Sequence, residues 1–431
     1  MKNRESGARV PKGGSRSSGV AGRPGEVAAE VGAVLEELTA IFGAWRPRGS
    51  DGAGAGCEAD GGRAPEGARG GDSGPGARGG TGETAPCEAE ALAGDGAFND
   101  LAMRIHEVQR ATNPVLRGFW DASPGGEPAS WREIPPVPAA AFRDVAIVSG
   151  TPERVFRTSG TTGGAGRRGE HHVPSLGLYR AAARANYRRH LMRGAESLRV
   201  LSLIPGPRES PDSSLSAMAG FIADEPEVSG VRWGFHPRDG VNVSAVRKAA
   251  SAAGPVLVLT TAFALVRLLD ALEGEPVPLP GGSRVMETGG FKGRAAEVDR
   301  ATLYGRAERA LDTPRSRIVN EYGMTELLSQ AYDGVAGAAA AVPDRLHRFP
   351  PWVRTRALDP ATLAPLPPGR PGLLAHFDLA NAGSVCHILT EDFGHTTADG
   401  GLRLLGRVPG SPARGCSLAA ESFLRTIRIA P

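Results

Sequence analysis

The sequence predicts an α/β fold in which a mostly parallel sheet is flanked by helices, with a small β-rich part at the C-terminal end. Short apolar strands alternate with amphipathic helices between about residues 98 and 330, a pattern typical of parallel sheets. Polar, glycine-rich loops directly follow several of these strands. At 431 residues the chain can hold one large domain or two ordinary ones, with an ample core.

Composition narrows the classes of function. The net charge is +3 and aromatic residues make up 5% of the chain, so nothing indicates a nucleic-acid partner or binding to an anionic membrane. No run of 18 or more apolar residues could span a membrane, and the basic N-terminus lacks the apolar centre of a secretory signal. The four cysteines have no C-x-x-C spacing, which favours neither a zinc site nor a disulfide framework. We expect a cytoplasmic protein.

The first 92 residues are expected to contribute one helix. Residues 1–25 have the composition of a disordered tail. Within residues 26–46, apolar side chains from Val31 to Trp45 recur at helical spacing and predict an amphipathic helix that ends before Pro47. Residues 47–92 are mostly Gly, Ala, Glu, Asp and Arg, too poor in apolar side chains to form a core. We therefore predict a disordered segment, of which residues 48–90 can be deleted without loss of stability.

Residues 93–349 are expected to form the α/β core, and residues 350–431 a β-rich subdomain. Apolar residues from Phe98 to Val108 mark one face of a first helix, and Val145–Val148 is interpreted as a strand. Further helices are predicted at residues 176–192, 241–252, 262–272 and 297–311. Further strands are predicted at residues 198–204, 256–259, 284–286, 317–319, 372–377, 384–389, 402–407 and 423–429.

The stretch from Thr158 to Gly166 combines hydroxyl side chains with four glycines and follows the apolar pair Val155-Phe156. Glycine lets the backbone turn so that several N–H groups converge, and hydroxyls add further donors. Both properties suit a loop that binds phosphate oxygens. The sequence of this loop differs from the P-loop motif G-x-x-x-x-G-K-[ST]. A flexible linker is the alternative reading, but ordered patterns on both sides favour a phosphate-binding loop.

Two more polar loops follow predicted strands, at Glu287–Gly293 and at Asn320–Glu326. In open α/β sheets ligands bind at the carboxyl ends of the strands, so three such loops indicate one nucleotide site. Glu326 is a candidate ligand of Mg²⁺ beside phosphate, Tyr322 offers a flat face to a base, and Asp392 can bind ribose hydroxyls. Each residue alone is more commonly surface or packing, and only their co-occurrence supports the site.

These motifs resemble those of the adenylate-forming superfamily of acyl and aryl ligases. Thr158–Gly163 is similar to its phosphate loop, Tyr322–Glu326 to its Y-G-x-T-E motif, Asp392 to its ribose-binding aspartate and Gly406-Arg407 to its hinge-adjacent G-R. From about Phe98 onward the chain is similar to the fatty acyl-protein synthetases of bacterial luminescence. Residues 213–215, 287–293, 320–330, 389–394 and 414–418 carry that similarity.

The resemblance implies an adenylate-forming fold and a two-step ligase reaction with ATP and Mg²⁺. A carboxylic acid, in this family a fatty acid, becomes an acyl-adenylate, and a thiol then takes the acyl group as a thioester. Thr325 would contact the α-phosphate and Glu326 would hold Mg²⁺. The β- and γ-phosphates would be held by Thr158, Ser159, Gly160, Thr161, Thr162 and Gly163. The remaining nucleotide contacts would come from Gly289, Gly290, Tyr322, Gly323 and Asp392.

One departure from the superfamily concerns its lid domain, which follows the G-R hinge and supplies a catalytic lysine. Here 24 residues follow Arg407 and none of them is lysine, so Lys292 and Arg407 are candidate substitutes. The resemblance also places the acylated cysteine of the acyl-protein synthetases at Cys416. The charge of Arg414, two residues away, would favour the reactive thiolate.

Three functions stay open at this point. In the leading one, the protein activates a fatty or other carboxylic acid, carries it on Cys416 and passes it to an acyl-reductase or acyltransferase. The alternatives are an acyl- or aryl-CoA ligase of the phenylacetate type and a non-catalytic scaffold that binds nucleotide. The chain length of the acid is not predicted.

Overall fold

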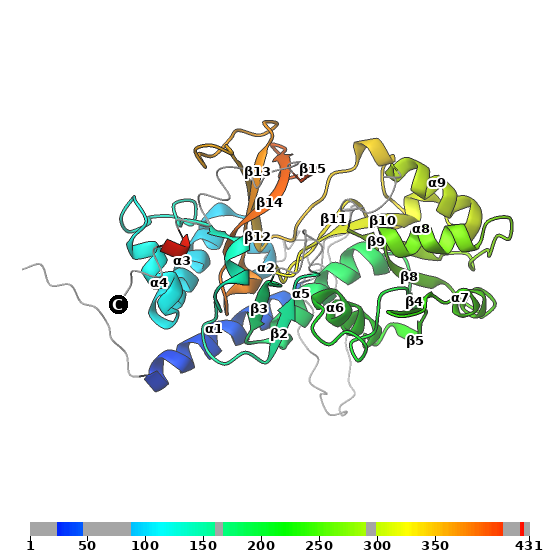
Figure 1. Cartoon of the computed structure of the whole chain (residues 1–431), viewed down its shortest axis with the longest axis horizontal. Coiled ribbons are helices and arrows are strands. Elements are labelled where there is room, and N and C mark those ends of the chain that lie inside the picture. The colour runs from blue at the N-terminus through cyan, green and yellow to red at the C-terminus, as the bar shows by residue number, and fades with distance from the viewer. Residues whose placement is uncertain (1–23, 46–87, 160–166, 290–298, 408–422, 426–431) are drawn as a thin grey trace, which may run out of the picture.

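The computed structural model describes residues 24–45, 88–159, 167–289, 299–407 and 423–425. Its centre is a six-stranded sheet in the order β11-β10-β9-β8-β4-β5 (Figure 1). The neighbours in this sheet are parallel except β10 and β11. The strands are β4 (Leu198–Ser202), β5 (Val228–Trp233), β8 (Val256–Thr261), β9 (Arg284–Thr288), β10 (Ile318–Tyr322) and β11 (Ala331–Tyr332).

Helices cover both faces of this sheet because successive side chains of each strand point to opposite faces. In β8, Val256 and Val258 pack with the apolar residues of α7 (Val243–Ala250), α8 (Ala262–Ala271) and α9 (Arg300–Leu311). Leu257 and Leu259 pack into the other core, with α5 (Leu176–Tyr187) and α6 (Ser214–Ala223). The side-chain oxygen of Thr261 accepts a hydrogen bond from the Ala264 N–H and so caps the N-terminus of α8. Threonine is one of the residues preferred at this position.

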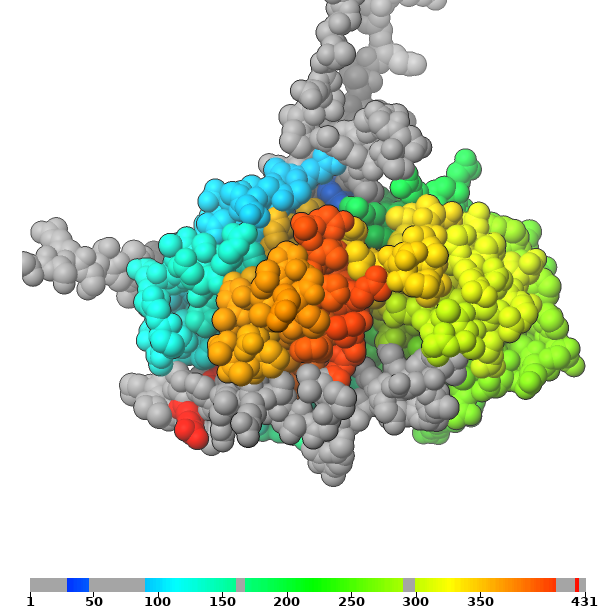
Figure 2. Space-filling view, turned by 90° about the horizontal axis from the view of Figure 1, so that it is seen from above, coloured from blue at the N-terminus to red at the C-terminus, as the bar shows by residue number. Residues whose placement is uncertain are grey.

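A second sheet lies beside the first and is built from the C-terminal strands (Figure 1). It contains β12 (Val353–Leu358), β13 (Gly372–Asp378), β14 (His387–Thr396) and β15 (Leu402–Arg407), and β1 (Val137–Pro138) joins it parallel to β14. In Figure 2 the strands β13–β15, orange to red, lie between the cyan N-terminal helices and the yellow-green side that carries α9.

The C-terminal strands share their core with the helices α1 (Pro24–Ala44), α3 (Asp95–Thr112) and α4 (Pro114–Asp121). Phe42 of α1 stacks on Trp352 with ring centroids 4.1 Å apart, and Phe98 of α3 packs edge-on against Phe377 of β13 at 5.8 Å. The apolar stripe of α1 therefore contributes to the main core, and this burial of large aromatic surface fixes the helix to the body.

Shorter elements complete the described chain. They are α2 (Glu88–Ala91), η1 (Ala139–Arg143), β2 (Arg154–Arg157), β3 (Glu170–Val173), the π-helical η2 (Arg188–Met192), β6 (Phe235–His236), β7 (Gly240–Val241), η3 (Arg315–Arg317), η4 (Val342–Asp344) and η5 (Leu379–Asn381). No helix within the described ranges is long and apolar enough to cross a membrane.

The structure differs from the sequence-based expectations at four places. Val145–Val148 is not a strand, and β2 pairs antiparallel with β3, so the glycine-rich stretch connects a two-stranded hairpin instead of following a strand of the parallel sheet. Phe423–Arg425 is helical, with Phe423 packed on Phe119. Near the end of the segment expected to be disordered, α2 forms and Leu92 is buried, because this leucine joins the core of α1 and α3.

Candidate active site

A pocket of about 580 Å³ opens at the carboxyl ends of β8, β9 and β10, on the face of the sheet that α5 and α6 cover. Four predicted site residues line it together: Ser159 from the β2–β3 hairpin, Gly289 after β9, and Gly323 and Thr325 after β10. The opposite wall comes from the N-terminal end of α6, including Ser213, Ser214, Leu215 and Met218. The structure thus brings the three predicted loops to one concave site, although one of them arrives from a separate hairpin.

Two glycines at this edge have structural reasons, a positive φ at Gly289 and a close carboxyl at Gly323. Gly289 has a φ of +81°, a conformation that side chains with a Cβ rarely adopt, and it lets the chain turn sharply at the end of β9. At Gly323 a Cβ atom would lie 2.6 Å from Oε1 of Glu321, too close for any side chain while that carboxyl keeps its place. Both positions leave backbone exposed to the pocket, as a site for a close-fitting ligand needs.

Glu321 is a pocket residue that the sequence reasoning missed. It precedes Tyr322 in β10, it is only 3% exposed, and its Oε2 accepts a hydrogen bond from the hydroxyl of Thr288. Burial raises the pKa of this carboxyl to about 7, against the opposing effect of the Thr288 hydrogen bond. A charged residue inside a buried strand was the available signal, because carboxylates are seldom fully buried unless they are paired or functional.

Tyr322 points to the opposite face of β10 from Glu321, toward the C-terminal sheet. Its hydroxyl donates a hydrogen bond to Oδ2 of Asp392 at 2.8 Å and lies 3.1 Å from Nε2 of His376. Arg407 donates from Nε to the other oxygen of Asp392 at 3.3 Å. Burial lowers the pKa of His376 to about 4, so this ring is neutral at physiological pH. The predicted residues Tyr322, Asp392 and Arg407 therefore form one hydrogen-bonded group.

Glu326 lies close to this group and is 8% exposed. Burial lowers the pKa of Arg407, but the charges of Asp392, Glu391 and Glu326 outweigh it and raise that pKa above its ordinary value. In the part of the chain that the structure describes, no three His, Cys, Asp or Glu side chains gather as a ready metal cage. A divalent ion at Glu326 would take its other ligands from phosphate oxygens and water, as Mg²⁺ commonly does.

His171 on β3 ties the hairpin to the motif loop. Its Nδ1 lies 2.8 Å from the carbonyl oxygen of Thr325, and its Nε2 lies 2.8 Å from the Ser384 hydroxyl. Burial lowers the pKa of His171 to about 4, so both contacts are made by a neutral ring. The sequence reasoning missed this residue, because the contact joins positions 154 residues apart.

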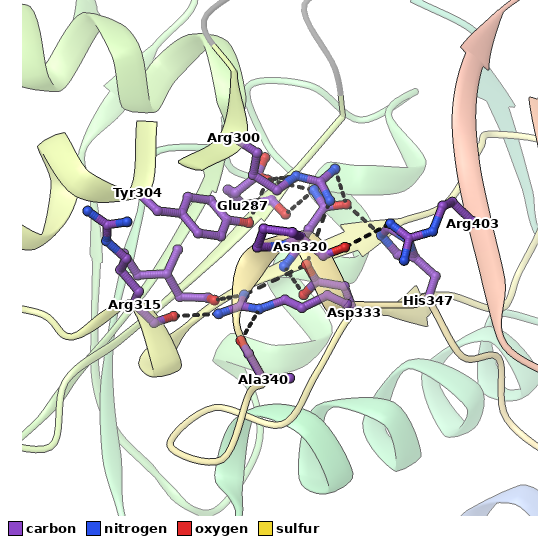
Figure 3. Close-up of polar contacts among 12 residues, drawn as sticks. Glu287, Arg300, Tyr304, Arg315, Asn320, Asp333, Ala340, His347 and Arg403 are labelled. Atoms are coloured by element: carbon purple, nitrogen blue, oxygen red, sulfur yellow. Dashed lines mark hydrogen bonds and ion pairs between the residues drawn. The ribbon is translucent and has the colours of Figure 1, made fainter. Parts of the chain in front are cut away.

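On the α9 side of β9 and β10 lies a polar network centred on Asn320 (Figure 3). Asn320 Nδ2 donates to Oε1 of Glu287 at 2.7 Å, and the Tyr304 hydroxyl donates to the same oxygen at 3.0 Å. The Asn320 backbone N–H donates to Asp333 Oδ1 at 2.7 Å. His347 and Arg300 contact the Asn320 amide oxygen from the far side at 2.6 and 3.1 Å. This network fixes the backbone from which the motif loop starts.

Several predicted site residues lie outside the described residues: Gly160, Thr161, Thr162, Gly163, Gly290, Lys292 and Cys416. Thr158 is described, and its hydroxyl accepts a hydrogen bond from the Gly169 N–H at 2.9 Å, which closes the hairpin. Cys386 is 1% exposed, and burial raises the pKa of its thiol well above the usual range. Its Sγ is contacted by Gln109 Nε2 at 3.6 Å, so this thiol is a packed structural group and no nucleophile.

Comparison with known proteins agrees with the motifs. The family model described as acyl-protein synthetase, LuxE, matches residues 268–424. A long-chain-fatty-acid–luciferin-component ligase of Vibrio harveyi is 38% identical over 76 residues, which cover 16% of this chain and 20% of the relative. The protein of the same description from Aliivibrio fischeri is 28% identical over 137 residues, covering 31% and 34%. The matched parts thus span a fifth to a third of these curated relatives.

Solved structures show the fold. A 2-hydroxyisobutyryl-CoA ligase in an open conformation superposes with a TM-score of 0.54 at 18% identity, covering 73% of this chain and 75% of the ligase. The postadenylation state of a 2-hydroxyisobutyryl-CoA ligase gives a TM-score of 0.52 at 16% identity, covering 73% and 68%. The architecture is that of the adenylate-forming ligases. The resemblance predicted from the motifs is confirmed, and residues 268–424 match the acyl-protein synthetase family.

Proposed function

We propose that the protein is an AMP-forming ligase that activates a carboxylic acid with ATP and then binds the acyl group as a thioester on Cys416. The observation that carries the proposal is the single pocket at which Ser159, Gly289 and Thr325 meet from three separate loops. Such convergence of backbone N–H groups and hydroxyls suits the phosphates of a nucleotide and the charge that develops during adenylyl transfer. The family match and the fold support the same reaction class.

In the first step an oxygen of the substrate carboxylate bonds to the α-phosphorus of ATP, and the bond to the pyrophosphate oxygen breaks. Ser159 and the glycine-rich stretch after it would hold the β- and γ-phosphates, with Thr325 at the α-phosphate. Tyr322 and Gly289 would border the base, and Asp392, held by Tyr322 and Arg407, would receive the ribose hydroxyls. Mg²⁺ at Glu326 would neutralise phosphate charge.

In the second step the Cys416 thiolate attacks the acyl carbonyl carbon, and AMP leaves with the electron pair of the broken anhydride bond. Arg414 is the nearest cation in sequence that would favour the thiolate. An acyl-reductase or acyltransferase would then receive the group. The alternative is direct transfer to coenzyme A, which is favoured by the CoA ligases that share the fold.

The first step is tested by ATP–pyrophosphate exchange with a panel of acids. Acid-dependent exchange that needs Mg²⁺ supports a ligase. No exchange with any acid would leave only a nucleotide-binding scaffold.

The second step is tested with radiolabelled acid, ATP and Mg²⁺. The wild-type protein should acquire a label that hydroxylamine removes, and Cys416→Ser should keep pyrophosphate exchange but lose the label. Cys57→Ser is the matched control and should keep both. Formation of acyl-CoA by an unlabelled wild-type protein would favour the CoA ligase.

A further inference from the structure

The lining of the pocket combines apolar side chains with buried polar ones. Leu215, Met218 and Leu327 line the walls, and the last two are 2% exposed. The same pocket is lined by Glu321 and Gln330, each 3% exposed. A pocket shaped for an unsubstituted hydrocarbon chain would end in apolar side chains, because each buried polar group that faces hydrocarbon loses its hydrogen bonds to water.

These two polar groups are incompletely paired. Among the described residues, Thr288 is the partner of the Glu321 carboxyl and bonds only to Oε2. The other oxygen, Oε1, lies next to Gly323 at the pocket surface. The amide oxygen of Gln330 is buried, and none of the described groups bonds to it. Buried acceptors in native proteins are almost always paired, so the unpaired Gln330 oxygen, beside a Glu321 carboxyl that is bonded at only one of its oxygens, indicates that a ligand supplies a donor in this pocket.

Nearby cations do not neutralise Glu321. Arg157 and Arg168, the two basic residues of the pocket lining, are exposed. Arg157 pairs with Glu170 at 3.0 Å, and Arg168 pairs with Asp212 at 2.9 Å. The carboxyl of Glu321 therefore stays available to hydrogen-bond a group that enters the pocket.

We propose that the acid taken by this pocket carries a hydrogen-bond donor, a hydroxyl or amino group, on its chain, and that Glu321 receives this donor. The inference rests on the proposed function and names the class of substrate within it. A hydroxyl group that binds next to Oε1 replaces the hydrogen bond from water that the carboxyl loses when the acid enters. A methyl or methylene group leaves Oε1 without a hydrogen bond. The preference for the polar acid should be strong, because the unsubstituted acid leaves the buried carboxyl without a hydrogen-bond partner.

The test measures kcat/KM for ATP–pyrophosphate exchange with acids of matched length that are unsubstituted, hydroxylated or aminated. For the wild-type protein we expect a polar acid to exceed its unsubstituted counterpart by about tenfold or more. Whether the hydroxylated or the aminated series gives the larger ratio identifies the donor. This comparison needs no variant, so it does not depend on how well a substituted protein folds.

Variants then assign the preference to one side chain. Glu321→Leu should reverse the ratio in favour of the unsubstituted acid, and Glu321→Gln, which keeps an acceptor oxygen, should retain a preference for hydroxylated acids. Glu273→Leu, on an exposed turn after α8, is the control and should behave as the wild type. A wild-type protein that uses unsubstituted acids as well as polar ones, or an unchanged ratio in a folded Glu321→Leu, overturns the inference and leaves the ligase intact. Absence of exchange with every acid overturns the proposed function, and this inference with it.

Discussion

The two faces of the β9–β10 pair offer a direct comparison of two buried glutamates. Glu287 and Glu321 are each about 2–3% exposed, and burial raises the pKa of each carboxyl to about 7. Glu287 faces α9 and its Oε1 receives hydrogen bonds from Tyr304 and Asn320, with the Arg300 guanidinium 3.8 Å away. Glu321 faces the pocket and is hydrogen-bonded by Thr288 alone among the described residues.

The difference separates a structural carboxyl from one that is prepared for a ligand. On the α9 side the protein itself supplies two hydrogen bonds to Oε1 of Glu287 and a nearby guanidinium, while Oε2 is buried without a hydrogen bond among the described residues, so changes there should reduce stability. On the pocket side one place is left for a molecule from solution, so changes there should alter activity and selectivity. Two neighbouring strands can divide the two tasks because side chains alternate between the faces of the sheet: Glu287 of β9 is in register with Asn320 of β10, and Glu321 is the next residue and points to the other face.

The largest effect is expected from Asp333, which belongs to the polar network around Asn320 on the α9 side of the sheet. Its side chain is fully buried, accepts the Asn320 N–H at 2.7 Å and lies 3.7 Å from the guanidinium of the buried Arg345. Asp333→Ala leaves that buried cation without its nearby carboxylate and the N–H without its acceptor, so we expect a loss of about 3–5 kcal/mol in the free energy of unfolding. Denaturant titration measures it. Glu308→Ala, which removes an exposed pair with Arg315, should cost at most about 1 kcal/mol. Similar small losses in both variants would show that the network is not structural.

The next effect concerns the pH dependence of stability on the pocket side. The pKa of Glu321 is raised from 4.5 to about 7 in the folded protein, so folding favours its protonated form. Its contribution to stability is therefore greatest below pH 4.5, falls as the pH rises to about 7, and is constant above. Glu321→Gln lacks this titration, so the variant should gain up to about 3 kcal/mol relative to wild type across that window.

Thermal and denaturant unfolding at several pH values measure this difference. Glu273→Gln, at an exposed position, is the control and should follow the wild-type pH dependence. A difference between Glu321→Gln and wild type that does not change with pH would contradict the raised pKa and weaken the comparison of the two faces.

Whether a feature of this arrangement could be predicted from the sequence depends on how far apart in the chain the contacting residues lie. The start of α8 and the turns after β9 and β10 are local features, and the periodicity and glycines predicted them. The likeness of Tyr322–Glu326 to a family motif, with the other motifs, narrowed the predicted α/β fold to the adenylate-forming type. These features need only a few consecutive residues to be recognised.

The remainder depends on contacts between distant segments. Val145–Val148 has the composition of a strand, yet none of the described strands pairs with it and it forms an irregular segment. The antiparallel pairing of β2 with β3 joins segments on either side of the glycine-rich stretch, which periodicity does not reveal. The contact between His171 and Thr325, and the separation of Glu321 from Tyr322 onto opposite faces, likewise appear only once the sheet is assembled.

Glu326→Gln tests the proposed metal ligand, where a loss of activity without a loss of stability is expected. The amide keeps the shape of the side chain but removes one charge from the phosphate-binding side of the site. We expect acid-dependent exchange to fall about 100-fold, equal to about 2.7 kcal/mol, with little change in melting temperature. Excess Mg²⁺ should restore part of the activity if the loss lies in metal binding. Normal exchange in this variant would exclude Glu326 as a ligand, and a large drop in melting temperature would assign it a structural role.

The smallest effect is expected from Tyr322→Phe, which removes one hydroxyl from the group that holds Asp392. The ring stays packed among His347, Phe349 and His376, so its face toward a base is kept. What is lost is the 2.8 Å hydrogen bond that orients Asp392, while the Arg407 contact at 3.3 Å remains. Because Asp392 is proposed to bind the ribose, KM for ATP should rise about threefold to tenfold and kcat should change less.

Tyr332→Phe, whose hydroxyl contacts only the Met286 sulfur at 3.7 Å among the described groups, is the matched control and should leave KM unchanged. Equal effects of the two variants on KM would mean that the Tyr322 hydroxyl supports the fold and does not orient Asp392. In that case the network face would be structural throughout, and all of the ligand contacts of β10 would lie on the pocket side.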